Sequence, residues 1–381
     1  MNTPAYDLAP VLGVVAVGLA LALGPLLWFW LRHRGAGPAA RLRALALLVL
    51  FLSFDLVLLG AYTRLSDSGL GCPDWPGCYG QASPVGALAS IDAAQAAAPS
   101  GPVSRRKAWV EMAHRYSATA IGVMIAALAA LAVVASRRAR SGPSPRWALV
   151  TLLWVAVQGA FGALTVTMSL YPAIVTLHLL GGLGLLALLV VQAEHYEPRP
   201  VVLPRLLHIG AAVVAAAAAV QIALGGWVST NYAVLACLDF PGCQGSAWPA
   251  MDFASAFVLR RPLGEDGSGG ALSYPALTAI HFAHRLGAYV VVPALLALAW
   301  RLFVQGGTAR TFATALAGIV SWQAASGLAN VLLGWPLAAA VAHTAGSAAL
   351  AVTLSFLLVR ARSAPAALLG AGSGRRMSPT S

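Results

Sequence analysis

Charged side chains are scarce in this sequence. Of its 381 residues, 9% are Asp, Glu, Lys or Arg, whereas 59% are hydrophobic. So little polar surface cannot enclose a soluble core of this length, which indicates an integral membrane protein. The formal net charge is +12, but the arginines lie in short loops between apolar segments, where they set orientation in a membrane. This distribution argues against binding to nucleic acid.

The first apolar segment lacks the features expected of a cleavable signal peptide. The first apolar segment, near residues 11–31, is long for the core of a signal peptide and has no basic region before it. It ends in Arg32-His33-Arg34 instead of a small-residue cleavage site. We therefore interpret residues 1–35 as an additional N-terminal transmembrane helix.

Nine segments are long and apolar enough to cross the hydrocarbon core of a bilayer, which takes about 20 helical residues. They cover approximately residues 11–31, 42–62, 109–136, 147–168, 173–193, 205–228, 277–303, 310–334 and 337–360. The expected fold is therefore all-α.

Arginines concentrate in every second loop, as they do in the cytoplasmic loops of membrane proteins. These loops contain Arg32, Arg34, Arg41, Arg43, Arg137, Arg138, Arg140, Arg146, Arg199, Arg205, Arg301, Arg310, Arg360 and Arg362. The alternation predicts a cytoplasmic C terminus and long outward loops over residues 63–108 and 229–276. Residues 364–381, rich in Gly, Ser, Ala and Pro, are expected to form a disordered tail.

The sequence repeats itself at an offset of 165 residues, or 170 where a loop is five residues longer. The coinciding pairs are Cys72 with Cys237, Cys78 with Cys243, His114 with His284, Arg115 with Arg285, and His178 with His343. Chance matches among Ala- and Leu-rich helices do not reproduce Cys and His, so we infer an internal duplication. The predicted core has eight helices in two four-helix bundles, residues 42–198 and 199–363, after the extra first helix.

Each predicted half carries two histidines inside its spans, where titratable side chains mark functional sites by default. His114 and His178, and likewise His284 and His343, lie at matching depth in the outer half of the membrane. Two imidazoles facing each other across a bundle suit the axial ligands of a haem iron, whereas a catalytic zinc usually takes three protein ligands. We therefore expect a haem site in each half.

Glycines near these histidines are expected to let a flat macrocycle approach the helix backbone. They are Gly181, Gly182 and Gly346.

The residues near the first histidine of each half share an arginine and differ one helical turn earlier. Arg115 and Arg285 follow it near the outer boundary, where a guanidinium can pair with a haem propionate. One helical turn before it, Glu111 in the first half is replaced by His281. A carboxylate beside a haem pocket can relay protons or stabilise a developing cation. An ion pair of Glu111 with Arg115 or Lys107 is an equally good, structural interpretation.

The four cysteines lie in the two long outward loops, as Cys72 with Cys78 and Cys237 with Cys243. The outward side is oxidising and a Pro-Gly turn brings each pair together, so we expect one disulfide in each loop. We favour disulfides that brace the loops over the haem sites. The alternative is a redox-active pair that handles electrons or mixed disulfides.

The joint pattern resembles the haem A synthase family, over roughly residues 42–360. The resemblance is carried by the duplicated helices, the Glu-x-x-His-Arg motif from Glu111 to Arg115, the other three histidines, the outward cysteine pairs, and the stretch from Tyr62 to Pro76. It implies an enzyme of the bacterial inner membrane, with periplasmic cysteine loops, that oxidises the C8 methyl group of haem O to an aldehyde by successive hydroxylations.

The resemblance also implies roles for the two halves. The first, with Glu111, His114 and His178, would hold the haem O substrate, and the second, with His284 and His343, a haem B cofactor. Haem O synthase and the assembly of terminal oxidases are the implied partners. Whether the chain forms a homo-oligomer stays open.

Two other classes of function also remain open. A dihaem electron-transfer protein of the cytochrome b type would use the same paired histidines without needing the difference between Glu111 and His281. A thiol–quinone oxidoreductase would use the cysteine pairs as its active site.

Overall fold

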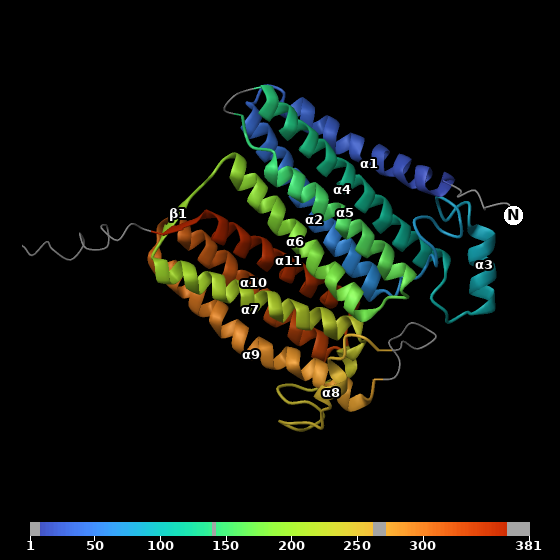
Figure 1. The fold of residues 1–381 in the computed structure, drawn as a ribbon. Coiled ribbons are helices and arrows are strands. Elements are labelled where there is room, and N and C mark those ends of the chain that lie inside the picture. Colours follow the sequence, from blue (N-terminus) through green and yellow to red (C-terminus); the bar gives the residue numbers. More distant parts are fainter. Residues whose placement is uncertain (1–7, 139–141, 262–271, 364–381) are drawn as a thin grey trace, which may run out of the picture.

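The computed structural model describes residues 8–138, 142–261 and 272–363, and this part of the chain is predominantly helical (Figure 1). The long helices are α1 (Ala9–His33), α2 (Pro38–Leu65), α4 (Arg105–Arg138), α5 (Arg146–Thr167), α6 (Pro172–Tyr196), α7 (Arg205–Thr230), α9 (Tyr274–Gln305), α10 (Gly307–Leu332) and α11 (Leu337–Arg360). The shorter elements are α3 (Leu88–Ala97), β1 (Val201–Leu203), η1 (Ala233–Leu235), α8 (Phe253–Ala256) and β2 (Ala361–Ser363).

Within the described residues, nine helices are long and apolar enough to cross a membrane. This confirms the predicted all-α membrane fold and the number of spans. Arg140, in one of the predicted cytoplasmic loops, and the predicted tail at 364–381 lie outside the described residues.

Proline, serine and glycine mark the ends of several spans. Pro38 and Pro172 occupy the first position of α2 and α6, where a missing N–H costs no helical hydrogen bond. Ser273 caps α9, because its side chain accepts a hydrogen bond from the N–H of Ala276 at 3.3 Å. At Gly306 the backbone adopts φ 76°, which lets α9 end at Gln305 and α10 begin at Gly307.

Within the described residues, the eight long helices after α1 pack as two rings of four. In the first ring α2, α4, α5 and α6 are neighbours in that order and α6 contacts α2; in the second, α7, α9, α10 and α11 are arranged in the same way. As a result, α4 and α6 lie diagonally across the first ring, and α9 and α11 across the second. Each ring is filled by its own buried apolar cluster, which contributes dispersion contacts between the helices.

The additional helix α1 packs outside the first ring, against α4 (Figure 1). Near its N-terminal end, Val14 joins a buried cluster that includes Cys72, Cys78 and Tyr116. The extra helix therefore covers the first cysteine loop. We call the end of the molecule with the two cysteine loops the loop end, and the opposite end, with β1 and β2, the strand end.

At the loop end, residues one repeat apart contact each other between the two rings. Arg64 donates a hydrogen bond to the carbonyl of Ser229 at 2.6 Å, and the Tyr232 hydroxyl donates to Asp67 Oδ1 at 3.0 Å. In both pairs the partners are 165 residues apart. A contact between equivalent residues is expected at a twofold axis, which here relates the halves approximately.

At the strand end, nearly equivalent positions of α6 and α11 contact each other. Arg360 Nη2 donates to Glu194 Oε1 at 2.6 Å, across a separation of 166 residues. The segments that follow these helices, β1 and β2, pair as parallel strands, with Val201 opposite Ala361. The pseudo-twofold axis therefore runs along the bundle from one end to the other.

Candidate functional site

The four predicted histidines lie on the diagonal helices of the two rings: His114 on α4, His178 on α6, His284 on α9 and His343 on α11. The ring centroids of His284 and His343 are 6.5 Å apart, with an interplanar angle of 85°. An imidazole nitrogen lies about 2 Å from a metal that it binds. The second half thus leaves room for one metal atom between its two rings.

A glycine on a neighbouring helix lies against each of these imidazoles. The pairs are Gly60 with His114, Gly162 with His178, Gly225 with His284, and Gly327 with His343, and a Cβ added to the glycine would lie 3.0, 3.5, 2.9 and 3.3 Å from the imidazole Cε1. Most of these distances are tighter than an ordinary Cβ contact. Glycine therefore lets each imidazole sit close to the backbone of the adjacent helix.

The glycines predicted to admit a macrocycle, Gly181, Gly182 and Gly346, are different residues, and that role stays a prediction. A Cβ at Gly181 would meet the side chain of Gln158, and one at Gly346 would meet Gln323 and Trp322. The useful signal was instead the repeat itself, since Gly60 and Gly225 are separated by the same 165 residues as the cysteines.

In the second half, both histidines have a polar partner at Nδ1. Gln221 Nε2 lies 3.0 Å from His284 Nδ1 and donates to the His284 carbonyl at 2.9 Å. Ser326 Oγ lies 2.9 Å from His343 Nδ1 and donates its own hydrogen to the Trp322 carbonyl at 2.8 Å. Ser326 can thus accept a hydrogen bond from His343 Nδ1–H, which leaves Nε2 as the nitrogen able to bind a metal.

In the first half, Nδ1 of His114 and of His178 is buried and has no hydrogen-bond partner within the described residues. The positions equivalent to Gln221 and Ser326 carry Leu56 and Phe161, which cannot supply one. A buried polar atom without a partner costs about 1–3 kcal/mol. The first pair therefore has hydrogen-bonding capacity that is available to a bound molecule.

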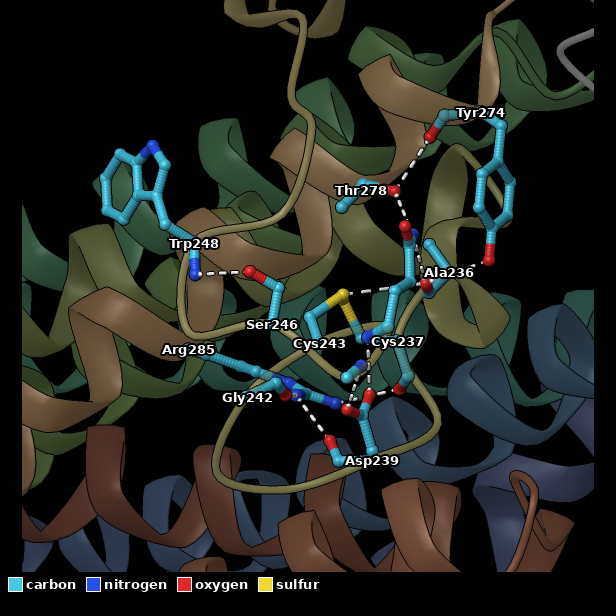
Figure 2. The surroundings of a disulfide bond; sticks show 12 residues. Ala236, Cys237, Asp239, Gly242, Cys243, Ser246, Trp248, Tyr274, Thr278 and Arg285 are labelled. Atoms are coloured by element: carbon cyan, nitrogen blue, oxygen red, sulfur yellow. Dashed lines mark hydrogen bonds between the residues drawn. A yellow bond between two sulfur atoms is a disulfide. The ribbon is translucent and has the colours of Figure 1, made fainter.

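The second cysteine loop is held from below by Arg285 (Figure 2). Its guanidinium donates to the carbonyl oxygens of Cys237 at 2.8 Å, Asp239 at 2.7 Å and Gly242 at 2.5 Å. The structure thus places this arginine on loop carbonyls. Contact between Arg285 and a haem propionate stays a prediction.

The first loop is held in the same way, with one addition. Arg115 donates to the carbonyls of Asp74 at 2.7 Å, Cys72 at 3.3 Å and Gly77, and it forms an ion pair with Glu111. The other oxygen of Glu111 accepts the N–H of Cys72 at 2.8 Å. Glu111 therefore makes the ion pair of the structural interpretation and also joins helix α4 to the loop. A propionate contact of Arg115 stays a prediction.

At the position of Glu111, the second half has His281. Its Nδ1 is buried and has no hydrogen-bond partner in the described part of the chain. The loop N–H groups and Arg285 thus have no carboxylate from α9 between them.

Both predicted disulfides are present. Cys72 is bonded to Cys78 and Cys237 to Cys243, each pair with a Cα separation of 4.9 Å. All four cysteines are buried. Figure 2 shows the second disulfide lying between the loop and α9. Each pair therefore forms the buried centre of its own loop.

An aspartate in each loop accepts two backbone N–H groups. Asp239 accepts those of Gln244 at 2.7 Å and Gly245 at 2.8 Å, and Asp74 makes the equivalent bonds in the first loop. The bond from Gly245, and then that from Gln244, hold the pKa of Asp239 below its usual value. The folded loop thus favours the ionised carboxylate.

Similarity to known proteins agrees with the motifs. Residues 43–355 match the family described as cytochrome oxidase assembly protein. The chain is 38% identical over 302 residues to the haem A synthase of Shewanella oneidensis, covering 78% of this chain and 90% of that protein. It is 30% identical over 330 residues to the haem A synthase of Caulobacter vibrioides, covering 80% and 91% of the two chains.

A further relative, the haem A synthase of Mesorhizobium japonicum, is 29% identical over 338 residues, which is 82% of this chain and 88% of that protein. The similarity spans both rings of helices and both histidine pairs. The chain therefore belongs to the haem A synthase family of cytochrome oxidase assembly proteins.

Proposed function

We propose that this protein is a haem A synthase, which oxidises the C8 methyl group of haem O to a formyl group. The carrying observation is the duplicated pair of histidines, each against a glycine of a neighbouring helix, in a chain of this family. Each hydroxylation inserts one oxygen atom and removes two electrons from the methyl carbon, so the reaction requires an external electron acceptor and an external oxygen source. The hydrate formed by the second hydroxylation loses water to give the aldehyde. When bound, haem B supplies one-electron transfer.

The second half is the proposed site of haem B. Ligands of a permanently bound cofactor are usually oriented by hydrogen bonds to their second nitrogen. Ser326 Oγ can accept such a bond from His343 Nδ1–H, and Gln221 Nε2 contacts His284 at Nδ1 and at its carbonyl oxygen. The 6.5 Å between the two ring centroids fits one iron atom between them.

The first half is the proposed site of haem O. His114 and His178 lack polar partners at Nδ1 among the described residues. Less firmly oriented ligands suit a molecule that must enter as substrate and leave as product. The apolar residues Leu56 and Phe161, in place of the polar pair, support this assignment.

Glu111 is the proposed catalytic residue of the first half. Its two oxygens accept one hydrogen bond from Arg115 and one from the Cys72 N–H. A carboxylate has about four lone-pair sites, so Glu111 can still accept a proton released during hydroxylation. Its negative charge can also stabilise a positive charge that develops on the carbon beside the macrocycle.

The orientation follows the arginine pattern. We place the loop end with both disulfides on the periplasmic side of a bacterial inner membrane, and the strand end with the C-terminal part in the cytoplasm. Haem O synthase, as the source of substrate, and terminal oxidase assembly, as the destination of product, are the proposed partners.

The test is haem extraction and chromatography from cells that express the full chain beside a source of haem O. We expect haem A in these cells, and haem B bound to the purified protein. Protein that carries haem B while the cells make no haem A would instead support the dihaem electron-transfer function. Thiol-dependent quinone reduction by haem-free protein would support the thiol–quinone oxidoreductase.

A further inference from the structure

A cationic pocket lies at the strand end, on the seam between the two halves. Its volume is about 200 Å³. Its lining includes the polar residues Arg199, Arg360, Arg362 and His195 and the apolar residues Trp147 and Val359. We propose that this pocket binds the phosphate headgroup of an anionic phospholipid, and that the bound lipid bridges the two halves.

The one carboxylate in the pocket lining is already shared by two arginines. Glu194 is 4% exposed, and its Oε1 accepts from Arg360 at 2.6 Å and from Arg43 at 3.4 Å. Its Oε2 accepts the backbone N–H of Arg199 at 3.1 Å. Arg43 also lies 4.0 Å from Glu197. Two carboxylates thus face four arginines, including Arg362, and the group keeps a positive charge.

Two guanidinium groups in this pocket retain free donors. Arg362 uses Nη1 for the carbonyls of Val359 and Ala361, which leaves Nη2 and Nε. The guanidinium of Arg199 has no hydrogen-bond acceptor within the described residues, and both side chains are exposed. A guanidinium binds phosphate oxygens with two parallel donors, which suits the anionic headgroup of a lipid.

The position of the pocket favours a lipid over a soluble phosphate compound as the ligand. Trp147 begins α5 and Val359 ends α11, so the apolar wall continues the surface of membrane-spanning helices. Tryptophan is enriched where the hydrocarbon core meets the headgroups, and basic pockets between spanning helices bind anionic headgroups. The volume is below the ~300–1,000 Å³ of sites for drug-sized ligands, which fits a headgroup and not a haem.

The pocket also has a structural setting that a lipid would reinforce. It includes the contact of Glu194 with Arg360, which joins α6 to α11. Beside it, β1 and β2 pair in parallel at the left of Figure 1. Membrane orientation alone explains why arginines lie at this end, but it does not require them to converge on one pocket.

Native mass spectrometry of the full, purified protein tests the proposal. We expect phosphatidylglycerol to be retained at least about tenfold better than phosphatidylcholine, since only the first carries a net negative charge. In Arg199→Gln/Arg362→Gln this preference should fall to near unity while haem content stays unchanged. The matched control is Arg137→Gln/Arg138→Gln, which removes the same charge from exposed positions at the strand end outside the pocket.

Two outcomes would overturn the proposal. One is full retention of phosphatidylglycerol by the pocket variant, or an equal loss in the control. The other is displacement of the lipid by inorganic phosphate or glycerol 3-phosphate at matched concentration, which would identify a soluble phosphate as the ligand. If the double variant aggregates, Arg199→Gln alone is the test, because it retains the backbone bond to Glu194 and should lower the preference several-fold.

Discussion

The two halves of the molecule share a frame but treat their histidines differently. In the second half, Gln221 and Ser326 contact the Nδ1 atoms of the paired histidines. In the first, Leu56 and Phe161 stand at these positions and the Nδ1 atoms have no partner in the described part of the chain. The glycine contacts, the disulfide and the arginine beneath it are repeated in both halves and form the frame of each site. The contacts at Nδ1 differ between the halves and set how firmly the histidines are oriented.

The second difference lies under the loops. Glu111 links Arg115 to the Cys72 N–H, whereas His281 leaves Arg285 without a carboxylate neighbour on its helix. The first half thus combines loosely held histidines with a carboxylate, and the second combines fixed histidines with none. This pairing of features is why we assign turnover to the first half and a resident cofactor to the second.

The largest expected effect separates the two histidine pairs. His343→Ala should lower bound haem B by more than about 100-fold, because the loss of a ligand exceeds the 10- to 100-fold effect of losing a ligand's hydrogen-bond partner. The equivalent His178→Ala should keep haem B and abolish haem A. Optical spectra and haem extraction measure both. Equal loss of haem B in the two variants would contradict the assignment of haem B to the second half.

Removal of the carboxylate should affect chemistry alone. Glu111→Gln is expected to lower haem A formation by about 10²–10⁴-fold, the usual contribution of a general acid or base. Haem O or its alcohol should accumulate while haem B stays bound, and His281→Ala should cause a milder loss. Haem chromatography from cells supplied with haem O gives the answer. Normal haem A from Glu111→Gln would return this residue to a purely structural role.

The two arginines should differ in their contribution to stability. Arg115→Ala leaves Glu111 buried without its ionic partner, which costs about 3–5 kcal/mol. Arg285→Ala removes hydrogen bonds from a charged donor to loop carbonyls, which costs about 1.5–3 kcal/mol. Denaturation in mixed micelles compares the free energies of unfolding. A larger loss for Arg285→Ala would show that the ion pair is not the stronger anchor.

A smaller effect should follow from changing the residues beside the histidine Nδ1 atoms. Ser326→Ala is expected to speed the loss of haem B by about tenfold, at the lower end of the range for such contacts. Phe161→Ser should leave haem B retention unchanged, because it alters the other half. Transfer of haem to apomyoglobin measures the rate. If both substitutions acted alike, the Nδ1 contacts would not distinguish the sites.

The smallest effect concerns pH. The folded loop lowers the pKa of Asp239 below 3.8, so its stabilisation is complete above that value and is lost as the pH falls through the lower folded value. The exchange rates of the Gln244 and Gly245 amides, each relative to the rate of an unprotected amide at the same pH, should therefore stay low at neutral pH and rise in strong acid. In Asp239→Asn this rise should be absent. Acid-dependent exchange in that variant would assign the effect to another group.

Much of the fold follows from residues that one sequence displays. Apolar length predicts each span, and the confirmed pairing of Cys72 with Cys78 and of Cys237 with Cys243 follows from loop spacing and an oxidising side. Gln221 is a polar residue inside an apolar span, and its bonds from α7 to His284 on α9 cross-link two helices. These features depend on side-chain chemistry or on local spacing, so the sequence alone is enough to predict them.

The missed features depend on backbone atoms and on packing. The contacts of Arg285 with the carbonyls of a folded loop were not predicted, because backbone carbonyls are the same for every residue type. Its contact with a propionate stays a prediction. The contact of Gly60 with His114 depends on how α2 rotates against α4. Among several nearby glycines, residue type alone does not identify the one that faces a ring.

The contacts along the pseudo-twofold axis have an evolutionary consequence. In a dimer of half-length chains, the bond from Arg64 to Ser229 would join a position to its own copy, and so would that from Tyr232 to Asp67. Any substitution in such a dimer enters both sites at once, so a carboxylate gained by one site is imposed on the other. Fusion into one chain removes this coupling. The seam could persist while each site accumulated its own mutations, which is how Glu111 and His281 can coexist in one molecule.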